Sequence, residues 1–100
     1  MVKHVILWKI DEKYSPSEKN EIRNGAKAQL ESLVGQIDGL IELEVRILPL
    51  ESSNADMMLD SLFADSDALR GYAHHPAHNA VADKYVRPFT SQRLCIDYEI

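Results

Sequence analysis

The amino-acid sequence predicts an α+β domain in which helices cover one face of a four-stranded antiparallel sheet. Runs of β-forming residues lie at 2–10, 40–48, 55–64 and 93–99, and helical patterns occupy 16–34 and 68–85 between them. The link between the second and third runs is short and polar, which predicts an antiparallel hairpin. The resulting element order is β-α-β-β-α-β.

The first run, residues 2–10, contains four β-formers in succession, Val5-Ile6-Leu7-Trp8. Apolar residues occur at both odd and even positions, so we expect a strand buried on both faces or nearly so. Because strand side chains alternate, one face would carry His4, Ile6, Trp8 and Ile10, and the other Lys3, Val5, Leu7 and Lys9.

The first helix has a clear start at Ser15-Pro16-Ser17-Glu18, with serine at the N-cap, proline in the first turn and glutamate closing a capping box. We expect this helix to run to about Val34 and to stop at Gly35. Its apolar stripe, at helical spacing, consists of Ile22, Ala26, Leu30, Leu33 and Ile37.

The second and third strands alternate cleanly between apolar and polar positions. In residues 40–48 we expect one face to carry Ile41, Leu43, Val45 and Ile47, with Glu42, Glu44 and Arg46 opposite. In residues 55–64 we expect Met57, Leu59, Ser61 and Phe63 on one face, with Met58, Asp60 and Leu62 on the other.

The last third of the chain predicts two short helical stretches and a final strand. Asp65 is a candidate cap for a helix from Ala68 to about Tyr72, and Pro76 restarts the chain into a second stretch ending at Tyr85. The strand at 93–99 completes a ferredoxin-like order. Because the helix-free face of such a sheet would mix apolar and charged residues, we expect a C2 homodimer packed sheet to sheet.

Length and composition favour one soluble domain. The chain has 100 residues, a net charge of −5 and no basic run, which argues against nucleic-acid binding. Residues 1–10 are too short and too polar for a signal peptide or a membrane span. The single cysteine, Cys95, cannot form an intramolecular disulfide, so we expect a cytoplasmic protein without membrane contact.

The segment Tyr72-Ala-His-His-Pro-Ala-His78 concentrates the groups best suited to acid–base chemistry. The His75-Pro76 corner could direct Tyr72 and His78 towards the sheet, where His78 would act as a general base and Tyr72 would donate a hydrogen bond to an oxyanion. The structural alternative is that Tyr72 packs on the sheet and His78 caps a helix.

A metal site among these histidines is not expected. Pro76 interrupts the histidine spacing, no cysteine or second carboxylate completes a ligand set, and Asp83 is the nearest acidic candidate. His74 is expected to be a solvated helix end. His4 shares a strand face with Ile6 and Trp8, so it is either a satisfied core residue or a third functional group opening on the same cavity.

A cavity between sheet and helices would be lined by apolar side chains, of which the candidates are Ile6, Trp8, Met57, Leu59, Phe63, Leu94 and Ile96. Cys95 lies among apolar residues and is expected to be buried and inert. There is no phosphate-binding glycine loop or dinucleotide fingerprint, so we expect no cofactor.

Over residues 2–99 the chain resembles the stress-responsive A/B barrel (Dabb) family. The resemblance rests on Lys3-His-Val-Ile-Leu-Trp-Lys9, on the Tyr-x-x-His-Pro-x-His element at 72–78, and on Leu94-Cys-Ile-Asp-Tyr98. It implies a dimeric ferredoxin-like α+β barrel. Many members of this family have no known reaction, so the resemblance implies a fold more firmly than an activity.

The chain is also similar to one enzyme of that family, olivetolic acid cyclase, which closes a linear polyketide by an aldol reaction without a cofactor. That resemblance implies His78 as general base, Tyr72 as its hydroxyl partner and His4 as a polar pocket residue. Where the cyclase has a further pocket histidine, this chain has Met57, and Arg23-Asn24 and Lys27 stand where an alkyl tunnel would need apolar residues. We therefore do not extend the polyketide substrate to this chain.

Two classes of function follow. The first is a cofactor-independent enzyme, of the cyclase or isomerase type, that acts on a small carbonyl compound through His78, Tyr72 and His4. The second is a noncatalytic, stress-associated dimer that binds a small molecule or is purely structural. A monooxygenase-like activity is a third and weaker alternative. An open cavity of about 300 Å³ or more between Tyr72 and His78 would favour the enzyme.

Overall fold

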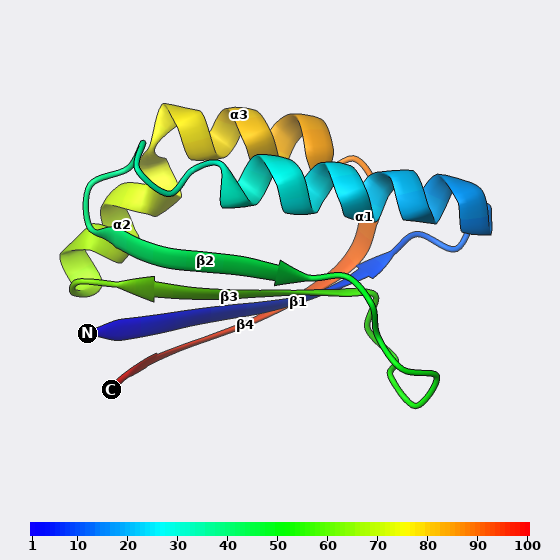
Figure 1. Ribbon diagram of the computed structural model, residues 1–100, viewed down its shortest axis with the longest axis horizontal. Helices are drawn as coiled ribbons and strands as arrows, with labels where there is room; N and C mark the ends of the chain where they lie inside the picture. The colour runs from blue at the N-terminus through cyan, green and yellow to red at the C-terminus, as the bar shows by residue number, and fades with distance from the viewer.

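Four strands form one antiparallel sheet in the order β2-β3-β1-β4, and the three helices lie together on one of its faces (Figure 1). The computed structural model describes all of residues 1–100. In chain order the elements are β1 (Val2–Ile10), α1 (Pro16–Glu31), β2 (Leu40–Arg46), β3 (Met57–Phe63), α2 (Ser66–His74), α3 (Pro76–Tyr85) and β4 (Thr90–Glu99).

The predicted α+β class and β-α-β-β-α-β plan are confirmed, with the second helical region divided into α2 and α3 at Pro76. We call the helix-bearing side of the sheet the inner face and the other side the outer face. The hydrophobic core lies between the inner face and the helices, and its most deeply buried members include Ile10, Ala26, Val45 and Phe63. No helix is both long and apolar enough to cross a membrane.

Helix α1 begins as predicted, because Ser15 accepts from the backbone of Glu18 while the Glu18 side chain accepts from the backbone of Ser15. The helix ends at Glu31, three residues earlier than expected. The following turn bends back to start β2, and it carries Leu33 and Ile37 into the core with 1% and 5% exposure. The apolar stripe was therefore predicted correctly although the helix end was not.

Strand β2 contains a register shift between Leu40 and Glu42 that sequence alternation did not reveal. The extra residue, Ile41, is 43% exposed, whereas Leu40 is buried and occupies the core position expected for Ile41. Leu43 and Val45 point to the core as predicted. The alternation of β3 is confirmed, since its odd-numbered positions from Met57 to Phe63 are buried.

Strand β1 is buried on one face only, which corrects the expectation of burial on both. Its even-numbered residues are buried beneath the helices, while Leu7 on the outer face is 38% exposed. Strand β4 is an edge strand that pairs only with β1, and the helices pack mainly over the other three strands. Cys95 on β4 is consequently exposed rather than buried as expected.

Candidate functional site

The corner between α2 and α3 brings Tyr72 and His78 together. His75 adopts an extended backbone, ends α2 and caps α3, and its Nδ1 accepts a hydrogen bond from the Ala77 backbone at 3.1 Å. Tyr72 in the last turn of α2 and His78 in the first turn of α3 then stack, with ring centroids 4.1 Å apart and ring planes at 38°. His75, rather than His78, is the capping residue, and His74 is exposed at the end of α2.

Tyr72 is packed on the sheet, yet its hydroxyl has no hydrogen-bond partner. The side chain is 2% exposed and meets Phe63 edge to face at a centroid distance of 5.0 Å. Burial raises the pKa of the Tyr72 hydroxyl well above its usual range. The phenol therefore stays protonated, and it remains a free hydrogen-bond donor at any physiological pH.

His78 carries a second unpartnered group, because its Nδ1 is buried and makes no hydrogen bond. Desolvation lowers the pKa of His78 to about 4, and the nearby charges of Arg87, His4 and Arg93 act in the same direction. The imidazole is therefore neutral at physiological pH. A neutral imidazole has one nitrogen free to accept a proton.

His4 reaches the same region from the inner face of β1. It is 6% exposed, and its ring lies edge-on to Tyr72 at a centroid distance of 6.2 Å. Its Nδ1 is hydrogen-bonded to Oδ1 of Asp97, the residue directly opposite on β4. His4 is thus held by a carboxylate, and its ring lies against the Tyr72 side of the stacked pair.

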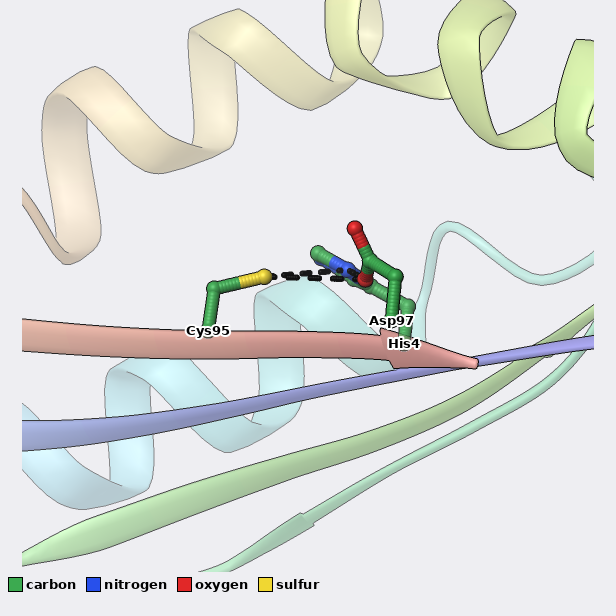
Figure 2. A group of neighbouring side chains, drawn as sticks. All are labelled: His4, Cys95 and Asp97. Atoms are coloured by element: carbon green, nitrogen blue, oxygen red, sulfur yellow. Dashed lines mark hydrogen bonds and ion pairs between the residues drawn. The ribbon is translucent and has the colours of Figure 1, made fainter. Parts of the chain in front are cut away.

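Cys95 joins His4 and Asp97 in a compact cluster on the inner face, where the three side chains rise from β1 and β4 towards the helices (Figure 2). The Cys95 Sγ lies 3.6 Å from Nδ1 of His4 and 3.5 Å from Oδ1 of Asp97. Desolvation and the Asp97 carboxylate raise the pKa of the Cys95 thiol. The expectation that Cys95 is buried among apolar residues is therefore wrong, because its thiol lies in an exposed polar cluster.

A cavity of about 120 Å³ connects these groups. His4, Tyr72 and His78 all line it, and so do three of the apolar residues expected there, Ile6, Trp8 and Leu59. Met57 and Phe63 are buried in the core without reaching the cavity wall. Leu94 and Ile96 lie on the outer face, because they pair with Leu7 and Val5, so they cannot line this cavity.

Two arginines also line the cavity, and they differ in how they are paired. Arg87 makes an ion pair with Asp83 at 2.6 Å, whereas Arg93 of β4 has no carboxylate partner. Sequence reasoning missed Arg93 and Asp97. The alternation of β4 places them with Cys95 on one face, but only the register of β4 against β1 shows that this face meets His4.

The polar residues of α1 do not line the cavity. Arg23 pairs with Asp56 at 3.0 Å, and Lys27 donates to the Val45 carbonyl at 2.8 Å and pairs with Glu31. These contacts tie α1 to the sheet. Arg23 and Lys27 are therefore engaged in contacts with the sheet and its flanking residues and do not extend the cavity at the α2–α3 corner.

The element order, the sheet order and the Tyr–His corner define a ferredoxin-like α+β domain with a small polar site between helices and sheet. A family model described as the stress-responsive A/B barrel domain matches residues 2–100, and the chain belongs to that family. No curated protein matches the chain.

The chain is similar in structure to solved proteins whose described functions differ from one another. A dimeric ferredoxin-like protein of unknown function from Bacteroides fragilis is 30% identical, with a TM-score of 0.92 over 99% of this chain and 95% of that one. A hydroxynitrile lyase from Passiflora edulis is 13% identical, with a TM-score of 0.76 over 99% and 92%. An antibiotic biosynthesis monooxygenase is 9% identical, with a TM-score of 0.74 over 100% and 98%. The last two likenesses show the fold alone.

Proposed function

We propose that this protein is a cofactor-independent enzyme that removes a proton from the carbon next to the carbonyl of a small keto acid, leading to isomerisation or cyclisation. One observation carries the proposal: the buried, unpartnered Nδ1 of His78 lies on the same cavity as Tyr72, whose side chain is 2% exposed and whose hydroxyl makes no hydrogen bond. A buried polar atom without a partner costs stability, so a ligand that pairs with Nδ1 of His78 would offset that cost.

The chemistry follows from the state of each group. The C–H electron pair of the substrate passes into the carbonyl to form an enolate, while Nδ1 of His78 takes the proton. The protonated Tyr72 hydroxyl donates to the developing oxyanion. Asp97 positions His4 against Tyr72, and His4 orients the phenol or the bound substrate.

Cavity size and charge favour a small anionic substrate. A volume of about 120 Å³ admits only a compound of a few heavy atoms. The unpaired guanidinium of Arg93 on the lining would bind a carboxylate. That carboxylate would also offset the cationic surroundings that lower the pKa of His78, and would therefore make His78 a stronger base.

Proton exchange in D₂O tests this function without knowledge of the final product. Small 2-keto and 3-keto acids are incubated with the protein, and deuterium incorporation at the carbon next to the carbonyl is followed by NMR. We expect exchange above the buffer rate for at least one acid. His78→Ala should reduce it by about 100-fold or more, and Tyr72→Phe should reduce it while the protein stays folded.

His74→Ala is the matched control, because His74 is an exposed histidine four residues away that does not line the cavity. It should exchange protons at the wild-type rate. If His78→Ala exchanges as fast as wild type, His78 is not the base and the proposal is wrong.

A noncatalytic role is the second candidate, and the size of the cavity favours it. The volume of about 120 Å³ is below the roughly 300 Å³ expected of an ordinary ligand pocket. In that case the protein would be a stress-associated dimer that binds a small molecule, or one whose corner residues only define the fold. Saturable binding of a keto acid without any exchange would support this candidate over the enzyme.

We propose further that the protein forms a C2 homodimer through the outer face, and that it works in the cytoplasm. Several structural neighbours are described as dimeric. The outer face presents exposed apolar side chains on β1 and β4, among them Leu7, Leu94, Ile96 and Tyr98. Burying these side chains against a second copy would supply the association energy. The unpaired thiol of Cys95 is compatible with a reducing compartment.

A further inference from the structure

Three side chains of different ligand types converge on one point of the inner face, outside the histidine cluster that the sequence emphasised. His4 Nδ1, Cys95 Sγ and Asp97 Oδ1 all lie within 4.8 Å of one another (Figure 2). Two adjacent strands place them there, since His4 is directly opposite Asp97 and Cys95 is two residues along the same face of β4. Strands hold such a set more rigidly than loops would.

The spacing of these atoms fits a tetrahedral metal ion. Zinc binds sulfur at about 2.3 Å and histidine nitrogen or carboxylate oxygen at about 2.1 Å, so sulfur lies about 3.6 Å from either of the other ligands. The observed separations of Sγ from Nδ1 and from Oδ1 are 3.6 Å and 3.5 Å. Only the hydrogen-bonded His4–Asp97 pair would have to open to reach a tetrahedral edge of about 3.4 Å.

We propose that His4, Cys95 and Asp97 form a zinc site with three protein ligands and one open position for water. Thiolate, imidazole and carboxylate together suit zinc rather than magnesium or calcium, which prefer oxygen ligands alone. A thiolate and a carboxylate balance the charge of a divalent ion. The site has an entry path, because Cys95 is exposed and the Asp97 side chain is 44% exposed.

Arg93 is the one cation on the same face of β4 near this cluster, two residues from Cys95. Its charge opposes the approach of a metal ion. Arg93→Gln should therefore strengthen zinc binding, whereas loss of any of the three ligands should weaken it by about 100-fold or more, beyond what loss of a supporting hydrogen bond costs.

Cobalt(II) provides a sharp test because the chain contains only one cysteine. We expect the full-length, chelator-treated protein to bind one Co²⁺ per chain, with a sulfur-to-cobalt charge-transfer band and the intense visible bands of tetrahedral coordination. Zinc should displace the cobalt and abolish both features. Cys95→Ser should abolish the charge-transfer band, and Asp97→Asn should lower the affinity about 100-fold without unfolding this half-exposed position.

His74→Gln controls for adventitious binding to an exposed histidine and should bind cobalt like wild type. His78→Ala should also bind it normally, because metal binding at this cluster does not depend on the proposed proton transfer. Absence of a charge-transfer band in the wild-type protein would overturn the proposal. So would an Asp97→Asn variant with unchanged affinity and spectrum, since Cys95 would then be binding the metal without the cluster.

Discussion

At the scale of single residues, the site is marked by polar groups that the protein leaves without partners. Tyr72 and His78 stack on one another, but the hydroxyl of one and the Nδ1 of the other make no hydrogen bond. Asp97 by contrast is hydrogen-bonded to His4, so a ligand that binds either of these side chains has to open that bond first. Tyr72 and His78 are therefore the groups free to bind or react with the keto acid, whereas His4 is held in place by Asp97 and orients them.

Tyr72→Phe separates stability from function. Removing a hydroxyl that makes no hydrogen bond within the protein should leave the free energy of unfolding unchanged or raise it by about 1 kcal/mol. The same change should weaken keto-acid binding and proton exchange. Chemical denaturation of both proteins measures the first effect, and destabilisation by more than 1 kcal/mol would mean that the hydroxyl has a structural partner.

His78 should make stability depend on pH in a defined window. Its pKa is about 4 in the folded protein against a usual 6.5. Between pH 4 and pH 6.5 the unfolded chain therefore binds a proton that the folded protein does not bind. The stability contributed by neutral His78 is fully present above pH 6.5, is lost as pH falls towards 4, and amounts to at most about 3 kcal/mol.

His78→Gln should remove this part of the pH dependence. Urea denaturation of wild type and variant at pH 7, 6, 5 and 4 measures it as a difference, which cancels the contribution of other titrating groups. Parallel stability curves for the two proteins would contradict the depressed pKa.

The Tyr72 and His78 pair could be predicted from sequence because both residues belong to one local motif. Proline next to His75 fixes the corner, and helix periodicity on either side sets the two directions. Asp97 and Arg93 could not be predicted in the same way. Their relation to His4 depends on the pairing register of strands more than eighty residues apart in the chain, which no local pattern records.

At the scale of elements, local chemistry predicted where α1 begins but not where it ends. The capping box at Ser15 is a short-range signal, whereas the end at Glu31 is set by the need to bury Leu33 and Ile37 in a turn. The register shift at Ile41 is likewise a tertiary effect, since Leu40 takes the core position next to β3. The predicted strands and helices are therefore present, but tertiary packing determines where some of them end.

Gly39, which joins this turn to β2, should not tolerate a side chain. Its φ is +82°, and a Cβ would lie 2.4 Å from the Cβ of Ala68 in α2. Gly39→Ala should cost about 2–4 kcal/mol, from the left-handed backbone and the overlap together. Chemical denaturation measures the loss, and adding Ala68→Gly should recover only the part due to overlap.

Gly71 in α2 is the matched control, since a Cβ there would meet nothing within 4 Å. Gly71→Ala should stabilise the protein by about 0.5–1 kcal/mol, because alanine is the better helix former. A Gly39→Ala protein as stable as wild type would show that neither the positive φ of Gly39 nor its close approach to Ala68 constrains this turn.

At the scale of the whole molecule, the two faces of the sheet differ in how far they are buried. The helices cover the inner face over β1, β2 and β3, while the outer face exposes Leu94 and Ile96 at 70% and 62%. The mixed character of this face was predicted from strand alternation. Its exposed apolar side chains explain why a pattern typical of a strand buried on both sides appears in β1.

Ile96→Glu should convert the proposed dimer to a monomer. A carboxylate at the centre of an apolar interface would be buried without a partner, which weakens association by several kcal/mol. Sedimentation at micromolar concentration measures the mass. Asp83→Ala on the exposed surface of α3 is the control and should remain dimeric, and a monomeric wild-type protein would remove the dimer proposal.

A site-resolved NMR titration of His78 tests most directly whether the groups at the α2–α3 corner bind an anionic ligand. In the free protein the His78 ring should remain neutral down to about pH 4. Saturation with a small keto acid should raise its pKa, because the bound carboxylate offsets Arg93 and favours the imidazolium. A His78 that titrates near 6.5 in the free protein, or whose pKa no keto acid changes, would contradict the account.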